Sequence, residues 1–179
     1  MELSASNPGL SRAILRSSTG RELVFPVGSG SKGIRPEGAR FVNGWSLLGR
    51  FRVTGILTSQ RFEMEATLIA KSGKEETELR KVLFANMSRI DFDGDGAARE
   101  YGTGFAGLEP ENRAVPQPFG FGEYRGVFRW FSYAVHGTED ESRVGRRSTG
   151  GCINLRRADL ERVLAELRVG SRVEIRQIR

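Results

Sequence analysis

Residues 127–154 read VFRWFSYAVHGTEDESRVGRRSTGGCIN, and this stretch decides the fold of the chain. It begins with an apolar run that is typical of a β-strand and that ends at His136. A loop rich in serine, glycine and arginine then leads to Cys152. The chain of 179 residues contains one histidine and one cysteine, and both lie in this stretch, each beside a glycine.

The two residues together fit the chemistry of acyl transfer. A catalytic cysteine attacks as its thiolate, so it needs an imidazole to take its proton and backbone N–H groups to stabilise the oxyanion. Two glycines directly before Cys152 allow a tight turn that a substrate can approach closely. Each residue alone has an ordinary explanation, because single cysteines and histidines are commonly core or surface residues without chemistry. If Cys152 and His136 form an ion pair, the thiolate should persist well below the usual cysteine pKa of about 8.5.

The flanking sequence predicts a mainly β fold in a single domain, residues 1–179. Its 23 glycines indicate many turns. Alternating or continuous apolar residues predict strands, and apolar residues at helical spacing predict two helices. The expected strands are 21–27, 45–57, 127–135 and 172–178, and the expected helices are 74–89 and 159–167. Ser72 with Glu75 predicts a capping box for the first helix, and residues 96–126, rich in glycine and proline, predict a long ordered loop.

Composition excludes several classes of protein. Lys and Arg outnumber Asp and Glu 28 to 22, which suits an anionic partner, but no zinc-finger spacing or RNA-binding motif indicates nucleic acid. One cysteine and one histidine cannot supply a zinc site or an intrachain disulfide. No apolar run approaches the roughly 18 residues of a transmembrane helix, and no signal peptide is visible at the N-terminus.

The histidine and cysteine segments resemble the motif of the L,D-transpeptidase (YkuD-type) catalytic domain family. That motif is a His-Gly or His-Ser pair, followed after a loop by Ser/Thr-x-Gly-Cys and by Arg or Asn two residues later. Here the two parts are His136-Gly137-Thr138 and Ser148-Thr149-Gly150-Gly151-Cys152-Ile153-Asn154. Residues 20–58 and 124–179 are similar to the family's first strands and to its usual ending.

The resemblance implies a β-sandwich and a cysteine enzyme of peptidoglycan synthesis, which serves cell-wall biogenesis and cell shape in the envelope or periplasm. Family members form an acyl-enzyme with a stem tetrapeptide, release the terminal D-Ala and pass the acyl group to an amine. Peptidoglycan stem peptides are then the expected partner, and no cofactor is required.

The resemblance also implies a role for each residue of the motif. Cys152 is the nucleophile, His136 is the base, and the backbone carbonyl of Gly137 orients the imidazole. The N–H groups of Gly150, Gly151 and Cys152 form the oxyanion hole. Thr149 and Asn154 are the expected substrate-binding residues.

Residues 59–123 depart from the family pattern. They match nothing in its minimal motif and carry the helix expected at 74–89, so we interpret them as a helical and loop insertion within the one domain. We expect this insertion to pack beside the active-site face, because it returns directly into the strand that delivers His136. Gly150 is a second departure, since the family often has histidine there.

The insertion also contains an acidic run, Asp91, Asp93 and Asp95, followed by glycine, that looks like the start of a calcium loop. The twelfth position of such a loop, which normally supplies a bidentate glutamate, is Gly102. Two readings remain open: a structural Ca²⁺ site, or an acidic turn that caps the preceding helix.

Three functions remain open as well. The first is the transpeptidase. The second is an L,D-carboxypeptidase with the same site that passes the acyl group to water. The third is a non-catalytic cell-wall-binding module, which would have no need of both His136 and Cys152. Papain-like peptidases are disfavoured because their cysteine precedes their histidine in sequence, whereas this chain has the histidine first.

Overall fold

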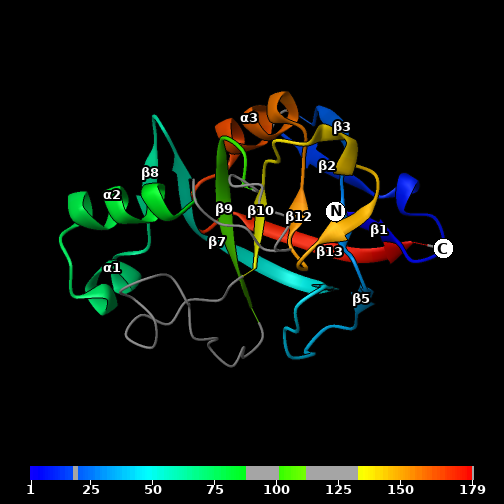
Figure 1. Ribbon diagram of the computed structural model, residues 1–179, viewed down its shortest axis with the longest axis horizontal. Coiled ribbons are helices and arrows are strands. Elements are labelled where there is room, and N and C mark those ends of the chain that lie inside the picture. Colours follow the sequence, from blue (N-terminus) through cyan, green and yellow to red (C-terminus); the bar gives the residue numbers. More distant parts are fainter. Residues whose placement is uncertain (18–19, 88–100, 112–132, 179) are drawn as a thin grey trace.

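A computed structural model describes residues 1–17, 20–87, 101–111 and 133–178. Within these residues most strands join one curled, mixed sheet of nine strands (Figure 1). Its strand order is β12-β10-β9-β7-β13-β1-β2-β3, and β8 pairs with β7 beside this path. The strands are β1 (Glu2–Ser4), β2 (Arg12–Arg16), β3 (Glu22–Pro26), β7 (Gly49–Thr58), β8 (Phe62–Met64), β9 (Gly104–Pro110), β10 (Ala134–His136), β12 (Ile153–Asn154) and β13 (Arg172–Ile178).

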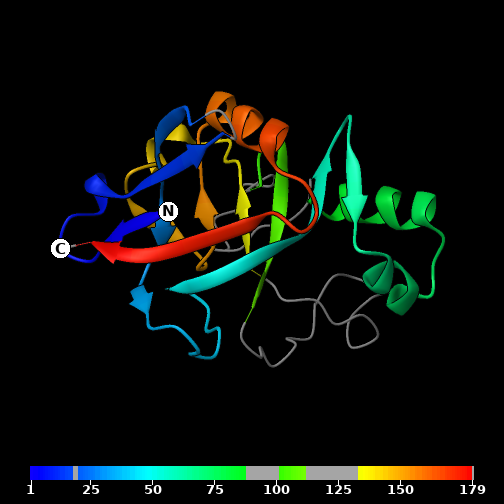
Figure 2. The same ribbon diagram turned by 180° about the vertical axis from the view of Figure 1, so that it is seen from behind.

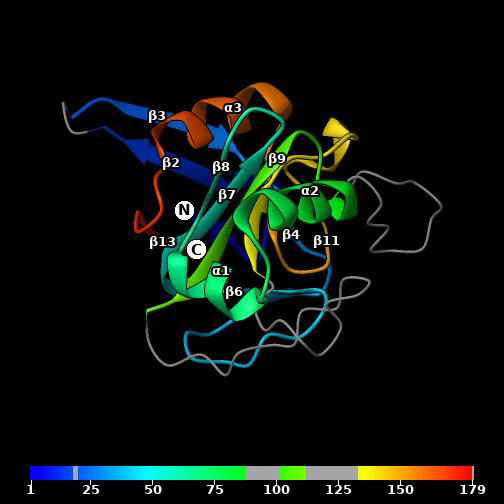
Figure 3. The same cartoon turned by 90° about the vertical axis from the view of Figure 1, so that its left-hand side faces the viewer.

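Two short parallel pairs and three α-helices complete the described part of the fold. The pairs are β4 (Ser29–Gly30) with β11 (Arg147–Thr149), and β5 (Gly33–Arg35) with β6 (Trp45–Leu47). The helices are α1 (Ala66–Ser72), α2 (Glu76–Met87) and α3 (Arg157–Glu166), with 3₁₀ turns at η1 (Pro8–Leu10) and η3 (Glu141–Arg143). Helix α3 lies across the curled sheet (Figure 3), whereas α1 and α2 lie with β8 at one end of the molecule (Figure 2).

The predicted mainly β fold is confirmed. Strand β3 corresponds to the expected strand at 21–27, and β13 coincides with that at 172–178. The stretch at 45–57 forms two strands, β6 and β7, instead of one. The helix expected at 159–167 is α3, which buries Leu160, Val163 and Leu164 as the apolar spacing predicts.

The helix expected at 74–89 corresponds to α2, whereas α1 before it was not expected. Gly73 adopts a left-handed conformation, with φ of 67°, and ends α1 there, so α2 begins only at Glu76. Ser72 is consequently the last residue of α1 and not the cap of α2. Its hydroxyl donates to the Ile69 carbonyl at 2.6 Å and accepts from the Lys74 N–H at 3.2 Å, so the predicted capping box with Glu75 does not form.

The long loop expected at 96–126 is also wrong in part, because Gly104–Pro110 form strand β9 in the middle of the sheet, between β7 and β10. Two glycines and a proline made this segment look like a loop. Gly104 is required by close packing, since a Cβ there would lie 2.7 Å from the Leu57 carbonyl oxygen. This part of the 59–123 segment therefore belongs to the main sheet.

Some expectations lie outside the described residues. They are the calcium loop at Asp91, Asp93 and Asp95 and most of the strand expected at 127–135, of which Ala134 and Val135 belong to β10. Within the described residues, the helices are all too short and too polar to cross a membrane.

The edge of the sheet positions the candidate site. Strand β10 pairs in parallel with β12, with His136 opposite Asn154, and antiparallel with β9, with His136 opposite Phe105. Paired residues on neighbouring strands lie on the same face of a sheet, so these three side chains share a face. Helix α3 packs close to this edge, because a Cβ on Gly137 would lie 3.1 Å from a methyl group of Leu160.

Candidate active site

The structure brings the only cysteine and the only histidine to one edge of the sheet. His136 is the last residue of β10, and Cys152 directly precedes the parallel neighbour β12. Tyr101 links them. Its ring centroid lies 4.4 Å from that of the His136 imidazole, and its side chain hydrogen-bonds the thiol of Cys152. Both candidate catalytic side chains are buried, with exposed fractions of 9% for Cys152 and 6% for His136.

The imidazole of His136 is held by its own strand end. Its Nδ1 lies 2.5 Å from the backbone oxygen of Gly137. Because a carbonyl oxygen only accepts hydrogen bonds, Nδ1 carries the proton in this contact. In the neutral ring Nε2 is then the nitrogen that can accept a proton. The Gly137 N–H donates in turn to the Tyr101 carbonyl at 3.0 Å and to the Gly104 carbonyl at 3.2 Å, so the histidine corner is fixed to the segment that leads into β9.

The turn before Cys152 is held from inside by Thr149. The Thr149 hydroxyl donates to the Cys152 carbonyl at 2.6 Å and accepts from the Gly151 N–H at 3.1 Å. This hydroxyl is therefore occupied within the turn, in a buried side chain, and the expected role of Thr149 in binding substrate stays a prediction. The Gly151 N–H, one of three expected in the oxyanion hole, is likewise occupied by Thr149.

Backbone and side-chain groups from the β4–β6 region hold the turn from outside. The buried Ser46 hydroxyl donates to the Gly151 carbonyl at 2.7 Å and accepts from the Gly30 N–H at 2.8 Å. The Gly44 N–H donates to the Gly150 carbonyl at 2.7 Å. The turn is thus clamped at consecutive residues, as a preorganised site requires.

Gly151 meets a strict steric demand. Its φ is +128°, and a Cβ there would lie 2.6 Å from the Trp45 carbonyl oxygen and 2.8 Å from the Phe41 ring. A Cβ on Gly150 would instead meet the side-chain oxygen of Asn43, at 2.7 Å. A side chain can move away more easily than backbone, so the second of the two glycines is the more demanding position.

The thiol of Cys152 is protonated at neutral pH in this state. Burial raises its pKa to about 12, and this effect outweighs the hydrogen bonds from the N–H of Ala134, from its own N–H and from Tyr101, which lower it. The expectation that the resting thiolate persists below pH 8.5 is therefore wrong. An ion pair with His136 would lower the pKa of an exposed thiol. In this buried position the desolvation of the sulfur has the larger effect on the pKa.

Asn154 is packed beneath the site and is almost fully buried. Its backbone forms an isolated bridge with Gly28, with N–H to O distances of 3.0 and 3.2 Å. Its side-chain oxygen fills the space where a Cβ of Gly28 would stand, only 2.1 Å away. Among the described residues this oxygen has no hydrogen-bond partner. The expected substrate contact through Asn154 stays a prediction.

Three further residues shape the site without belonging to its motif: Tyr101, Ser46 and Tyr133. The buried Tyr133 hydroxyl donates to the Leu47 carbonyl at 3.0 Å and accepts from the Leu47 N–H at 3.2 Å, and burial raises its pKa above the ordinary tyrosine value. Tyr133 lies in the apolar run that predicts the histidine strand, which gave a signal for its burial. Tyr101 and Ser46 gave none, because their partners are distant in sequence.

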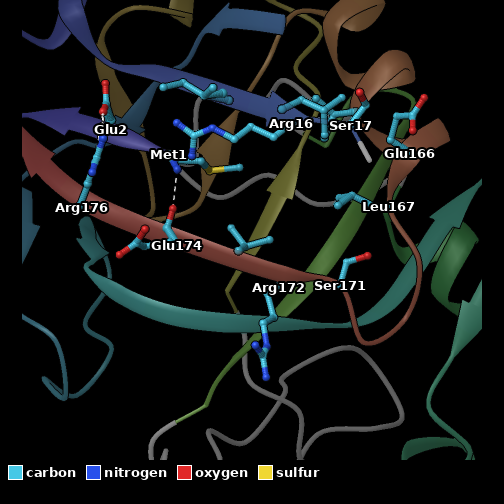
Figure 4. A pocket seen from close by; sticks show the side chains of 15 residues that line it. Met1, Glu2, Arg16, Ser17, Glu166, Leu167, Ser171, Arg172, Glu174 and Arg176 are labelled. Atoms are coloured by element: carbon cyan, nitrogen blue, oxygen red, sulfur yellow. Dashed lines mark hydrogen bonds and ion pairs between the residues drawn. The ribbon is translucent and has the colours of Figure 1, made fainter. Parts of the chain in front are cut away.

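The described residues contain no cluster of three or more histidine, cysteine, aspartate or glutamate side chains that could hold a metal ion. A surface pocket of about 560 Å³ does exist, lined by residues of β1, β2, α3 and β13 (Figure 4). Its arginines, Arg16, Arg172 and Arg176, are paired with glutamates, and none of the predicted site residues lines it. It is therefore separate from the cysteine–histidine site.

Comparison with known proteins agrees with this geometry. The family model named YkuD, described as the L,D-transpeptidase catalytic domain, matches residues 11–175. A search of curated proteins gives no match. The matched range includes the strand that ends at His136 and the clamped turn before Cys152, and it extends over most of the chain. The chain therefore belongs to the YkuD family of L,D-transpeptidase catalytic domains.

Proposed function

We propose that this chain is a peptidoglycan L,D-transpeptidase that transfers acyl groups through Cys152. The observation that carries the proposal is the convergence of the only thiol and the only imidazole on Tyr101, beside a turn clamped at Gly150 and Gly151. Cell-wall chemistry places such an enzyme in the cell envelope. The formal charge of +6 suits an anionic wall polymer.

In the acylation half-reaction, Nε2 of His136 takes the proton of the Cys152 thiol as the sulfur attacks the carbonyl carbon of the scissile peptide bond. A C–S bond forms and the carbonyl oxygen becomes an oxyanion. The Gly151 N–H is occupied by Thr149, so the candidate donors to this oxyanion are the N–H of Gly150 and the N–H of Cys152, which leaves the sulfur as the C–S bond forms. The C–N bond then breaks, and the leaving D-Ala amine takes the proton from His136.

In the second half-reaction the acceptor amine attacks the thioester. His136 takes one proton from that amine, a C–N bond forms, and the C–S bond breaks. The proton returns to the sulfur, which restores the buried neutral thiol. The raised pKa of Cys152 fits this cycle, because the sulfur needs to lose its proton only when a substrate carbonyl is in reach and His136 can take it.

Intact-mass measurement tests the proposal. After incubation with a carbapenem, the wild type should gain the mass of one carbapenem, and the Cys152→Ala variant should gain none while keeping its melting temperature within a few degrees. If the wild type stays unmodified under conditions that acylate a known family member, the proposal that this chain is an enzyme is wrong.

The acceptor is tested separately with a synthetic stem tetrapeptide and an amine acceptor. A cross-linked product supports the transpeptidase. Release of D-Ala with only tripeptide formed makes the protein a carboxypeptidase. Binding to peptidoglycan without any D-Ala release makes it a wall-binding module.

A further inference from the structure

Tyr101 contacts both halves of the candidate catalytic pair, although it lies outside the family motif. Its ring packs against the His136 imidazole, with 37° between the two ring planes. The Phe105 ring packs edge-on against the Tyr101 ring, with 5.7 Å between their centroids. Its side chain hydrogen-bonds the Cys152 thiol. Its backbone carbonyl accepts from the Gly137 N–H. Tyr101 is buried, so its side chain is held in these contacts by the surrounding residues.

We propose that Tyr101 is a positioning residue that sets the orientation of His136 and the place of the Cys152 sulfur. The proposal rests on the proposed function, because it assigns Tyr101 to the same site. It adds a residue from the 59–123 segment to that site.

The ring of Tyr101 acts on the imidazole. His136 is fixed at Nδ1 by the Gly137 carbonyl, but one hydrogen bond leaves the ring free to rotate about that axis. An aromatic ring with its centroid 4.4 Å away restricts this rotation. Because the Tyr101 carbonyl also holds the Gly137 N–H, displacement of Tyr101 moves both the imidazole and its hydrogen-bond acceptor.

The hydroxyl of Tyr101 acts on the sulfur. A hydroxyl donates to a thiolate more strongly than to a thiol, so this hydrogen bond lowers the pKa of Cys152 and opposes the effect of burial. The hydroxyl also fixes the rotamer of Cys152. The two parts of the tyrosine thus have separable effects, one on the base and one on the nucleophile.

Two variants separate these effects. Tyr101→Phe keeps the ring and removes the hydroxyl, and Tyr101→Leu removes both. Ser11→Ala is the control, because it removes a buried hydroxyl that accepts from the Ser4 N–H, far from Cys152 in the strand order. Two rates are measured between pH 6 and 9 by intact mass: alkylation of Cys152 by iodoacetamide, which needs only the thiolate, and acylation by a carbapenem, which also needs the base.

For Tyr101→Phe we expect alkylation about tenfold slower at each pH, equivalent to a displacement of about one pH unit, because a hydrogen bond to the charged sulfur is lost. Ser11→Ala should lower the melting temperature without moving this profile. Tyr101→Leu should acylate at least tenfold more slowly than Tyr101→Phe, and this additional loss should vanish when His136 is replaced by alanine, since the ring acts through His136.

An alkylation profile of Tyr101→Phe that coincides with the wild type overturns the role of the hydroxyl. An additional loss in Tyr101→Leu that persists in the His136→Ala background overturns the role of the ring. If Tyr101→Leu does not fold, Tyr101→Phe still tests the role of the hydroxyl. Tyr101→Trp, which changes the shape of the ring, then tests the role of the ring in place of Tyr101→Leu. A wild type that alkylates but never acylates contradicts the proposed function, whereas the alkylation comparison still decides whether Tyr101 holds the sulfur.

Discussion

Two regions meet at His136, and they are built in different ways. The cysteine turn, residues 148–155, is held by internal contacts, such as the hydroxyl of Thr149 with the carbonyl of Cys152, and by single hydrogen bonds from Ser46 and Gly44. The facing segment, residues 101–110, is fixed by pairing with strands far along the chain, β7 before it and β10 after it. The turn carries Cys152, the proposed nucleophile, and the facing segment carries Tyr101.

The difference shows which parts of the site are positioned by the short sequence motif and which are positioned by strand pairing in the sheet. Within the turn, the hydrogen bonds of Thr149 join residues at most three positions apart. The facing segment supplies the environment of the proposed reacting groups through long-range pairing. Changes in the two regions should therefore affect chemistry to different degrees, and the following experiments measure the difference.

The largest effect should come from His136, where the regions meet. His136→Ala should slow carbapenem acylation at pH 7 by about 10²–10⁴-fold, because the base that takes the thiol proton is lost. Since burial raises the pKa of Cys152 to about 12, the thiolate fraction below that pH grows with pH, and the variant's rate should rise about tenfold per pH unit between 6 and 9. Acylation rates by intact mass check this. Equal acylation rates for the variant and the wild type across this pH range would show that His136 is not the catalytic base.

A change within the cysteine turn should come next. Gly151→Ala should slow acylation by about a hundredfold, because a Cβ there meets the Trp45 carbonyl and φ is +128°. Gly150→Ala is the control and should cost less, since Asn43 can move its side chain. If both variants acylate at the wild-type rate, the turn is not the preorganised element described above.

A smaller effect should come from the facing segment. Gly102 has φ of +59°, and a Cβ there would lie 2.7 Å from the Thr138 N and 3.0 Å from the Gly137 carbonyl carbon. Gly102→Ala should therefore displace the Gly137 carbonyl that holds His136 and slow acylation by roughly tenfold. Gly73→Ala, also at positive φ but with open space around it, controls for backbone strain. An effect of Gly102→Ala as large as that of Gly151→Ala would erase the proposed difference between the regions.

The smallest effect should lie outside both regions. Glu2 is bound by Arg176 and Arg12, and their hydrogen bonds hold its pKa below the ordinary glutamate value. The contribution of Glu2 to stability is thus present above that ordinary value and is lost as the pH falls through the lowered one. Glu2→Gln should lower the melting temperature slightly at pH 7 and make it less sensitive to acid below about pH 4. Acylation rates at pH 7 should stay unchanged, and a change in them would show coupling from β1 to the site.

The sequence predicted the parts of the site that depend on local contacts. The order of His136 and Cys152, the paired glycines and the apolar face of α3 each left a pattern within a few residues. The sequence could not predict β9, because Gly104 and Gly107 read as loop residues, although the small size of Gly104 serves packing against β7. It did not predict the raised pKa of Cys152 either, since burial depends on the whole fold. Helix α1, which ends at Gly73, was not predicted either, because its seven residues are too few to show a clear helical period.

The burial of the resting thiol has a consequence for the protein's chemical durability. Oxidation by peroxide and exchange with disulfides both require an exposed thiolate, and the sulfur of Cys152 is neither exposed nor ionised at neutral pH. A sulfur in this state is slow to form sulfenic acid or mixed disulfides. If Cys152 is the nucleophile proposed above, we expect the fold to slow its oxidation between turnovers, because the sulfur gains reactivity only when His136 takes its proton.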